Sequence, residues 1–244
     1  MAEFSMEIAG KTARICSLFD STPHYFRPYL TENTPDFSIR VTEEDLRFEQ
    51  AELDREAREE GFRLRVFTDP FLERAAIQRA FAEFLFDYDT LLLHGSTIAV
   101  DGSAYLFTAR SGTGKSTHTR LWRETFGQRA VMINDDKPFL QLTKGQILAY
   151  GSPWSGKHGL DANISAPLRG ICLLERGTEN RIRPAEPSQL LPMLQKQAYL
   201  PMNPEKHPKF FQLLHTLAHQ IPLWYMTCTK DPAAAHIAFS AMSQ

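Results

Sequence analysis

The sequence predicts an α/β protein in which a mixed, partly antiparallel sheet surrounds a phosphate-binding loop. Residues 104–109 are an apolar run that leads through the glycine-containing segment 110–114 into a segment of helical character. Only the turn Asp101-Gly102 separates this run from the apolar residues before it, which is a strong hairpin signal. A doubly wound nucleotide-binding sheet would have a crossover helix here, so we expect the strand before the loop to pair antiparallel with its predecessor.

The composition is that of an ordinary globular chain, with 43% hydrophobic and 23% charged residues among 244. The net charge of −2 offers no general attraction for nucleic acids or anionic membranes. No apolar run approaches the roughly 20 residues of a membrane span, and the first residues do not resemble a signal peptide. Cys16, Cys172 and Cys228 are widely spaced, as is typical of reduced thiols. We therefore expect a cytoplasmic protein without nucleic-acid or membrane partners.

Residues 1–70 are expected to form a small N-terminal α+β lobe. Apolar and polar residues alternate on both sides of Gly10-Lys11, which predicts a hairpin. Thr42 precedes a strongly charged segment that Gly61 would end, which predicts a helix with a capped N-terminus. The expected elements are a hairpin within residues 5–18, a strand at 37–41, a helix at 42–60 and a strand at 62–67.

Residues 71–244 are expected to form the core domain. Residues 73–88 carry apolar side chains at helical spacing, and Lys144-Gly145 separates two short apolar runs that predict a second hairpin. The expected strands are 91–100, 104–109, 130–133, 139–142, 146–150, 168–175 and 223–229. The expected helices are 73–88, 115–126, 188–197, 205–220 and 232–242.

The segment after residue 109 carries the residue types that bind a polyphosphate. Gly112 and Gly114 let the backbone approach an anion closely, and the following helix N-terminus adds partial positive charge. Lys115 would reach the β- and γ-phosphates, and Ser116 would offer its hydroxyl to Mg²⁺. The usual pattern opens with glycine, where this chain has Ala109. The residues expected to bind the nucleotide are Ser111, Gly112, Thr113, Gly114, Lys115, Ser116 and Thr117.

Two carboxylates follow the next apolar strand. Asp135 and Asp136 come about 20 residues after Lys115, where the end of a strand could meet the phosphates. One could hold Mg²⁺, directly or through water, while the other accepts the proton of the acceptor hydroxyl.

Several basic residues are weaker candidates for contacts with phosphate or an acidic substrate. Lys157 lies in a glycine-flanked loop, Arg110 lies within the phosphate-binding loop, and Arg169 begins a buried strand. His215 and His219 share a helical spacing but lack the third ligand and the catalytic Glu of a zinc helix, so they are interpreted as an ordinary helix face.

Together these residues resemble the catalytic domain of HPr kinase/phosphorylase and, more distantly, ATP-dependent phosphoenolpyruvate carboxykinase. The similarity covers roughly residues 88–175, and its elements are Leu93-His94-Gly95, the loop with Lys115 and Ser116, Asp135-Asp136 and Arg169-Gly170-Ile171. The resemblance implies a mixed, partly antiparallel sheet around the phosphate-binding loop and an active-site histidine at His94. It also implies that Asp135 is the catalytic base and that Asp136 lies near Mg²⁺.

The chain departs from this family in ways that leave its acceptor open. Pro167 stands where the family has a metal-binding Glu, so the metal would depend on Ser116, the aspartates or Glu175. The N-terminal region does not resemble the family's regulatory domain, and its later arginine-bearing segment has no counterpart here. Relatives of this kind include kinases that act on free serine and on peptide hydroxyls.

The leading hypothesis is an ATP- and Mg²⁺-dependent kinase that phosphorylates a hydroxyl, with serine in a protein, in a peptide or as the free amino acid as acceptor. His94, Lys115 and Asp135 would act in catalysis, and Ser116 and Asp136 would hold the metal. One alternative is a regulatory protein that binds a nucleotide without phosphotransfer, and another is a carboxykinase-like metabolic enzyme. ADP or pyrophosphate as donor, a phosphorylase activity and a homo-oligomeric state also stay open.

Overall fold

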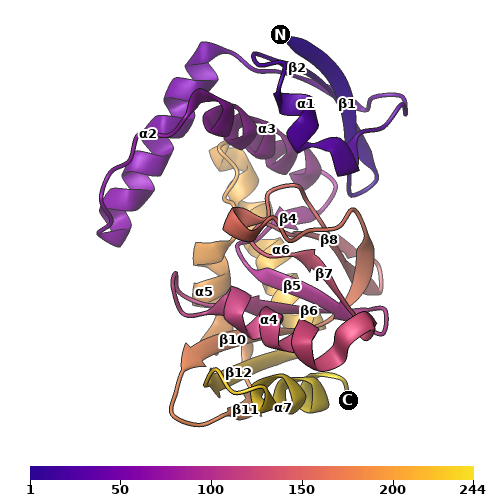
Figure 1. Ribbon diagram of the computed structural model, residues 1–244, viewed down its shortest axis with the longest axis vertical. Coiled ribbons are helices and arrows are strands. Elements are labelled where there is room, and N and C mark those ends of the chain that lie inside the picture. Colours follow the sequence, from indigo (N-terminus) through magenta and orange to yellow (C-terminus); the bar gives the residue numbers. More distant parts are fainter. The chain divides into compact units, whose positions relative to one another are not determined.

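A computed structural model describes residues 1–244, with the side chain of Glu60 excepted. The chain forms two compact units, Met1–Phe84 and Leu85–Gln244 (Figure 1). Helix α3 (Asp69–Phe86) crosses residue 70 without a break, and the first unit continues to Phe84. The expected boundary between domains 1–70 and 71–244 stays a prediction.

The first unit contains a three-stranded sheet in the order β1-β2-β3. β1 and β2 form the expected antiparallel hairpin, and β3 lies parallel to β2 at the edge. The elements are β1 (Ala2–Ile8), β2 (Lys11–Ser17), α1 (Thr22–Tyr25), η1 (Arg27–Tyr29), β3 (Phe37–Arg40), α2 (Glu43–Glu60) and α3.

Helix α2 begins and ends as the sequence predicts. The Thr42 side chain accepts from the Asp45 amide, and the Asp45 carboxylate accepts from the Thr42 amide, which is a capping box. Gly61 ends the helix with φ 72°, a left-handed conformation that glycine adopts without strain.

The strand expected at residues 62–67 is wrong. This segment forms neither helix nor strand and belongs to neither sheet. The Phe62 amide donates to the Ala57 carbonyl, and the Gln50 side chain bonds both the Phe67 amide and the Arg65 carbonyl. Backbone groups that a neighbouring strand would have paired are therefore bonded to helix α2.

The second unit contains a nine-stranded mixed sheet that confirms the predicted fold class. The strands run β4-β8-β9-β10-β6-β5-β7, and β12 pairs with β10 and β11. β10 lies parallel to β6 and β12, whereas β5 lies antiparallel to β6, as the Asp101-Gly102 turn predicts. The strands are β4 (Thr90–Leu92), β5 (Ser96–Val100), β6 (Ser103–Thr108), β7 (Ala130–Asn134), β8 (Phe139–Thr143), β9 (Gln146–Tyr150), β10 (Ser165–Arg176), β11 (Arg181–Pro184) and β12 (Leu223–Cys228).

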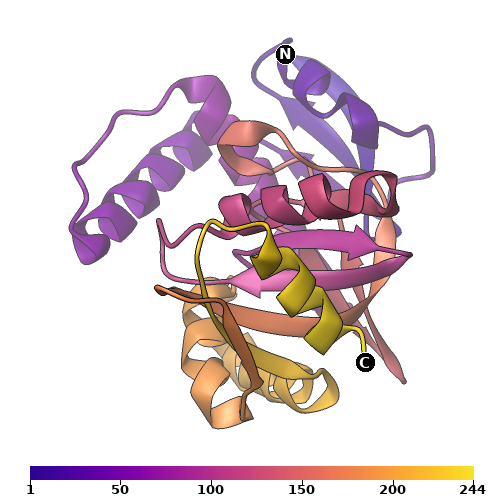
Figure 2. The same cartoon turned by 60° about the horizontal axis from the view of Figure 1, so that its bottom comes forward.

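Helices cover both faces of this sheet (Figure 2). Tyr105 and Phe107 on β6 pack into the core beneath α4 and α7, whereas Ala104 and Leu106 pack into the core beneath α5 and α6. β6 is therefore buried on both faces, as its continuous apolar run requires. The helical elements are α4 (Lys115–Phe126), η2 (Gly127–Arg129), η3 (Gly156–His158), α5 (Pro187–Gln197), η4 (Pro204–Lys206), α6 (His207–Gln220) and α7 (Ala233–Met242).

Two expectations from composition can be compared with the structure. Among the described residues, no helix has the length and apolar character needed to cross a membrane. Cys16, Cys172 and Cys228 are free, and burial raises the pKa of the Cys172 and Cys228 thiols. His215 and His219 stack on one face of α6.

Trp122 is the largest buried side chain beneath α4, and it anchors the helix that follows the glycine-rich loop. Its ring lies 5.1 Å from that of Phe107 and 5.8 Å from that of Phe239. Replacing Trp122 with Ala should lower the free energy of unfolding by about 3–5 kcal/mol, because it opens a cavity. Urea unfolding followed by circular dichroism measures the loss.

Phe211 on α6 is half-exposed and provides the control for this measurement. Phe211→Ala should cost clearly less, since its ring already contacts solvent. Equal losses in the two variants would contradict the anchoring role of Trp122.

Candidate functional site

The candidate site lies at one edge of the nine-stranded sheet, where three strand ends meet. β5 is antiparallel to both β6 and β7, so β6 and β7 run in the same direction and end beside the start of β5. The register pairs Ser96 with Phe107 and Thr97 with Asn134. The glycine-rich loop follows β6, the two aspartates follow β7, and His94 precedes β5. Pairing of these strands therefore brings together side chains that are far apart in the sequence.

The loop between β6 and α4 has a conformation suited to an anion. Gly112 and Gly114 have φ of 73° and 119°, which side chains with a Cβ rarely adopt. A Cβ at Gly112 would meet no atom within 4 Å, so the backbone is open on that side. Helix α4 begins at Lys115, and the loop thus leads directly to a helix N-terminus with its partial positive charge.

Arg176 holds this loop from the end of β10. Its Nη2 donates to the Gly112 carbonyl at 2.5 Å, and its Nε donates to the Thr113 carbonyl at 3.2 Å. The Thr113 amide also donates to the Arg110 carbonyl at 3.2 Å, so hydrogen bonds from Arg176 and within the loop together fix its conformation. The register that places Leu173 beside Thr108 brings Arg176 to the loop. Sequence reasoning missed this residue, because only the strand order shows that β10 neighbours β6.

Lys115 begins α4 and is almost completely buried. Its ammonium group donates to the Ala109 carbonyl at 3.5 Å, so the side chain folds back over the loop. Burial has the largest influence on the pKa of both His94 and Asp136, and the charge of Lys115 adds to the lowering at His94 and opposes the rise at Asp136. The lysine therefore acts electrostatically on the carboxylate edge of the site.

Asp135 is buried in a polar network that joins three elements. Its Oδ1 accepts from the Ser96 hydroxyl at 2.6 Å, and Ser96 Oγ lies 2.8 Å from Thr119 Oγ1. Thr119 Oγ1 also lies 3.3 Å from the Lys115 carbonyl oxygen. This network links the end of β7 to the start of β5 and to the first turn of α4, so it fixes Asp135 relative to the glycine-rich loop.

Asp136 and His94 form a second polar pair that is about one-third exposed. His94 Nε2 lies 3.1 Å from Asp136 Oδ1. Burial, together with the charges of Lys137 and Lys115, lowers the pKa of His94 to about 3. Burial raises the pKa of Asp136, although both lysines oppose the shift. The imidazole is therefore neutral near pH 7, and its Nε2–H donates to the carboxylate.

Asn134 shapes the turn that carries the two aspartates. Its Oδ1 accepts from the amides of Asp136 and Lys137 at 2.7 and 2.5 Å. Its Nδ2 donates to the Ser152 carbonyl at 2.7 Å and to the Trp154 carbonyl at 3.4 Å. One fully buried amide thus joins the turn after β7 to the loop after β9. The sequence showed only an Asn before two aspartates, a pattern usual in exposed turns.

Two glycines let the loop after β9 approach this turn. A Cβ at Gly151 would lie 1.8 Å from the Ala162 carbonyl oxygen, so no side chain fits there. Gly156 has φ 68°, and a Cβ on it would lie 3.3 Å from the Cβ of Asp136. The neighbouring Lys157 is exposed in η3, one residue away from this contact.

The other predicted residues are distributed unevenly around this site. Arg110 and Ser111 are exposed, whereas Thr113, Ser116 and Thr117 are half-buried. Arg169 lies outside this site. It comes directly before Gly170, which pairs with Tyr105, and it is about 13 Å along β10 from Leu173, the residue beside the loop. Lys137, which the sequence analysis did not select, contributes positive charge at both His94 and Asp136.

The residues present fit a nucleotide and a hard divalent cation. The open backbone at Gly112, the left-handed Gly114 and the charge of Lys115 suit a polyphosphate. Among the described residues no group of three or more His, Cys, Asp and Glu side chains could hold a metal. Mg²⁺ in phosphate-transfer sites needs only one or two carboxylates beside phosphate and water oxygens, which Ser116 and Asp136 could complement.

Comparison with known proteins identifies no family for this chain. No family model matches it, and no curated protein matches it. Among solved structures it is similar to the HPr(Ser) kinase/phosphatase from Coxiella burnetii, with 10% sequence identity and a TM-score of 0.37. The similarity covers 62% of this chain and 95% of that chain. At this degree of similarity, function has to be inferred from the geometry of the chain itself.

The lowered pKa of His94 leads to a prediction about its titration. The His94 imidazole should stay neutral between about pH 5 and 8, where a solvent-exposed histidine titrates. NMR titration of its ring protons measures this, with His94→Gln to assign the resonance. A midpoint near the ordinary value of about 6.5 would contradict the prediction.

The same shift sets the sign of one contribution to acid stability. Below about pH 6.5 the unfolded chain binds a proton at His94 that the folded chain does not bind until about pH 3. The contribution of His94 to the free energy of unfolding is therefore complete above about pH 6.5. It is lost progressively as the pH falls from about 6.5 to about 3.

Proposed function

We propose that this chain is an ATP- and Mg²⁺-dependent kinase that transfers the γ-phosphate to a hydroxyl. One observation supports the proposal above the others: one sheet edge gathers a glycine-rich loop with a lysine, two carboxylates and a neutral histidine. Phosphoryl transfer needs positioning and charge neutralisation more than covalent help, and these residue types supply both. Serine in a protein, in a peptide or as the free amino acid is the proposed acceptor.

The loop and the start of α4 are assigned to nucleotide binding. The backbone from Ser111 to Thr117 would hold the phosphates, and Lys115 would neutralise their charge. Arg176 keeps two of the loop carbonyls turned toward itself and so maintains the loop conformation. Bound Mg²⁺ would supply further neutralisation of phosphate charge, with Ser116 and Asp136 as its protein contacts.

Asp135 is assigned as the base that accepts the proton of the acceptor hydroxyl. Its Oδ1 is bonded to Ser96, and this bond holds the carboxylate in one orientation. His94 is assigned the positioning of Asp136 through its Nε2–H, and being neutral it adds no charge to that carboxylate.

The exposure of the two carboxylates favours a second assignment that exchanges their roles. Asp136 is about one-third exposed and has a raised pKa, as suits a base that meets a substrate from solvent. Asp135 is buried beside the first turn of α4, where a carboxylate could hold a metal. In both assignments the proton acceptor and the metal contact are neighbouring aspartates.

The alternative of a nucleotide-binding regulatory protein rests on the proline at residue 167. Pro167 lies on the part of β10 that pairs with β9, opposite Leu148. Along the strand it is about 20 Å from Leu173, which lies beside the end of β6. Residue 167 therefore lies away from the end of β6 that carries the glycine-rich loop.

The first experiment asks whether phosphate is transferred and to what. The purified chain is incubated with γ-labelled ATP, Mg²⁺ and a cell extract divided into protein and small-molecule fractions. Label that enters one fraction with the native chain and is absent with Lys115→Ala supports the kinase and identifies the class of its acceptor. Binding of ATP without transfer to either fraction would favour the regulatory alternative.

The two aspartates are then distinguished by matched amide variants. If Asp135 is the base, Asp135→Asn should lower turnover by about 10²–10⁴-fold and leave ATP affinity nearly unchanged. Asp136→Asn should instead raise the Mg²⁺ concentration needed for half-maximal rate. Steady-state kinetics with a Mg²⁺ titration measures both effects. The reversed pattern would assign the base to Asp136, and full activity in both variants would contradict either assignment.

A further inference from the structure

The loop between β9 and β10 has a part that the proposed function leaves unused. Residues 151–155 of this loop are buried, whereas residues 156–159, here called the loop tip, are all exposed. Within the described part of the chain, the side chains of Lys157 and His158 in the tip form no hydrogen bond and no ion pair. The loop tip therefore offers the unpaired ammonium group of Lys157 to a ligand.

Hydrogen bonds on both sides of the loop tip hold it beside the two aspartates. On one side, Asn134 bonds two carbonyls of the residues before the tip. On the other side, the Asp135 amide donates to the Leu160 carbonyl at 3.0 Å. Ser155 and Asp161 are bonded to each other across the base of the tip. The position of the tip relative to the aspartates is therefore fixed from both ends.

The loop tip lies on the far side of the aspartates from the glycine-rich loop. Asn134, at the end of β7, pairs with Thr97 of β5 on one edge and with Asp161 on the other edge. The order across this end of the sheet is therefore the end of β6, the start of β5, the end of β7 and the base of the tip. A nucleotide held by the loop after β6 and a ligand held by the tip would reach the aspartates from opposite sides.

Phosphoryl transfer needs such an arrangement of donor and acceptor. The attacking and leaving oxygens lie roughly in line, on opposite sides of the transferred group. The acceptor hydroxyl oxygen forms a bond to the γ-phosphorus, the bond from that phosphorus to the bridging oxygen breaks, and ADP leaves with the electron pair. The hydroxyl proton passes to an aspartate. With the donor on the side of β6, the rest of the acceptor extends toward the loop tip.

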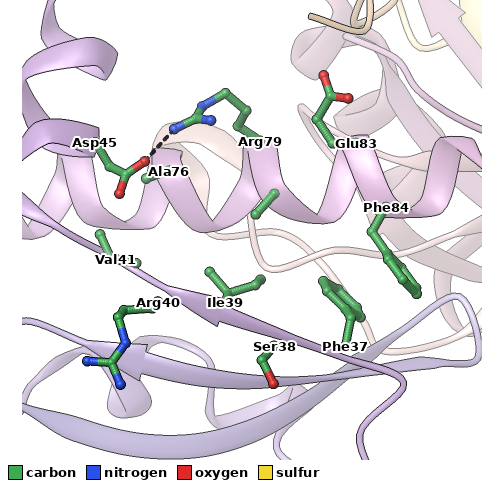
Figure 3. Close-up of a pocket in the computed structure, with 11 residues that line it drawn as sticks. Phe37, Ser38, Ile39, Arg40, Val41, Asp45, Ala76, Arg79, Glu83 and Phe84 are labelled. Carbon is green, nitrogen blue, oxygen red and sulfur yellow. Dashed lines mark hydrogen bonds and ion pairs between the residues drawn. The ribbon is translucent and has the colours of Figure 1, made fainter. Parts of the chain in front are cut away.

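A groove in the first unit does not serve this purpose. Its volume is about 440 Å³, and Figure 3 shows its lining, in which Arg79 is paired with Asp45 and Phe37 lies beside Phe84. All of its lining residues belong to the unit Met1–Phe84. None of the residues of the candidate site lines this groove, so it is not where the acceptor hydroxyl meets the aspartates.

We propose that Lys157 binds a carboxylate of the acceptor, so that this site phosphorylates hydroxyls that lie close to a carboxylate. The inference rests on the proposed kinase and narrows its substrate class. A lysine ammonium is a compact charge on a flexible stem, and its hydrogen bond to a carboxylate is charge-assisted. Free serine supplies this group as its α-carboxylate, and a peptide supplies it as an acidic side chain next to serine. Lys157 thus selects the acceptor and takes no part in proton transfer.

Blocking carboxylates tests this requirement before the acceptor is identified. The extract fraction that accepts label from γ-labelled ATP is treated with acidic methanol, which converts carboxylates to methyl esters and leaves hydroxyls intact. Labelling by the native chain should be lost and should return after mild alkaline hydrolysis of the esters. Whether the small-molecule or the protein fraction behaves in this way distinguishes a free hydroxy acid from an acidic peptide segment.

A variant without the charge tests whether Lys157 is the group responsible. Lys157→Met should raise the amount of extract fraction needed for half-maximal labelling by about 10–100-fold, since one charge-assisted bond is lost, and should leave the KM for ATP unchanged. Lys157→Arg keeps the charge and should retain most of the affinity. Lys144→Met is the matched control and should behave as the native chain. Lys144 is likewise an exposed loop lysine beside a glycine of positive φ, in the turn between β8 and β9.

The possible failures of this inference and of the proposed function are distinguishable. Labelling that survives esterification, or native dependence on the extract fraction in Lys157→Met, would overturn the inference alone. A raised KM for ATP with unchanged dependence on the fraction would also overturn it, by placing Lys157 at the donor phosphates. Absence of any labelling by the native chain would instead overturn the proposed kinase and, with it, this inference.

Discussion

The candidate site depends on one constraint of sheet topology, which is the position of β5 between β6 and β7 and antiparallel to both. Because of it, two strands end and one begins within a few ångströms of each other. The glycine-rich loop and the Asp135-Asp136 pair occupy the two ends, and His94 precedes the beginning. A parallel connection between β5 and β6 would have moved His94 to the opposite edge of the sheet.

Hydrogen bonds to the backbone then fix the shape of this edge. Arg176 bonds two carbonyls of the glycine-rich loop, and Asn134 bonds backbone groups on both the aspartate turn and the loop after β9. Buried backbone N–H and C=O groups need hydrogen-bond partners, and here one side chain bonds several of these groups. Residues that do not touch a substrate can therefore determine how well the site is formed.

The sequence predicted what depends on local patterns and missed what depends on long-range pairing. The hairpin at Asp101-Gly102 and the limits of α4 follow from turn chemistry and helical spacing, and both agree with the structure. Arg176 could not be found in this way, because its contact with Gly112 joins residues that are distant in the chain. Residues 62–67 have strand-like spacing, but Gln50 takes the backbone bonds that a neighbouring strand would need.

The packing at Gly151 has a consequence for recognising relatives of this chain. A methyl group there would overlap the Ala162 carbonyl, so the position accepts only glycine while this loop keeps its course. Asn134, with its bonds to two loops, is similarly hard to exchange. Glycine-rich phosphate loops occur in many unrelated proteins, whereas the glycine at residue 151 is required by the close approach of the Ala162 carbonyl in this chain. A search profile that weights these two positions above the loop would separate true homologues from chance matches.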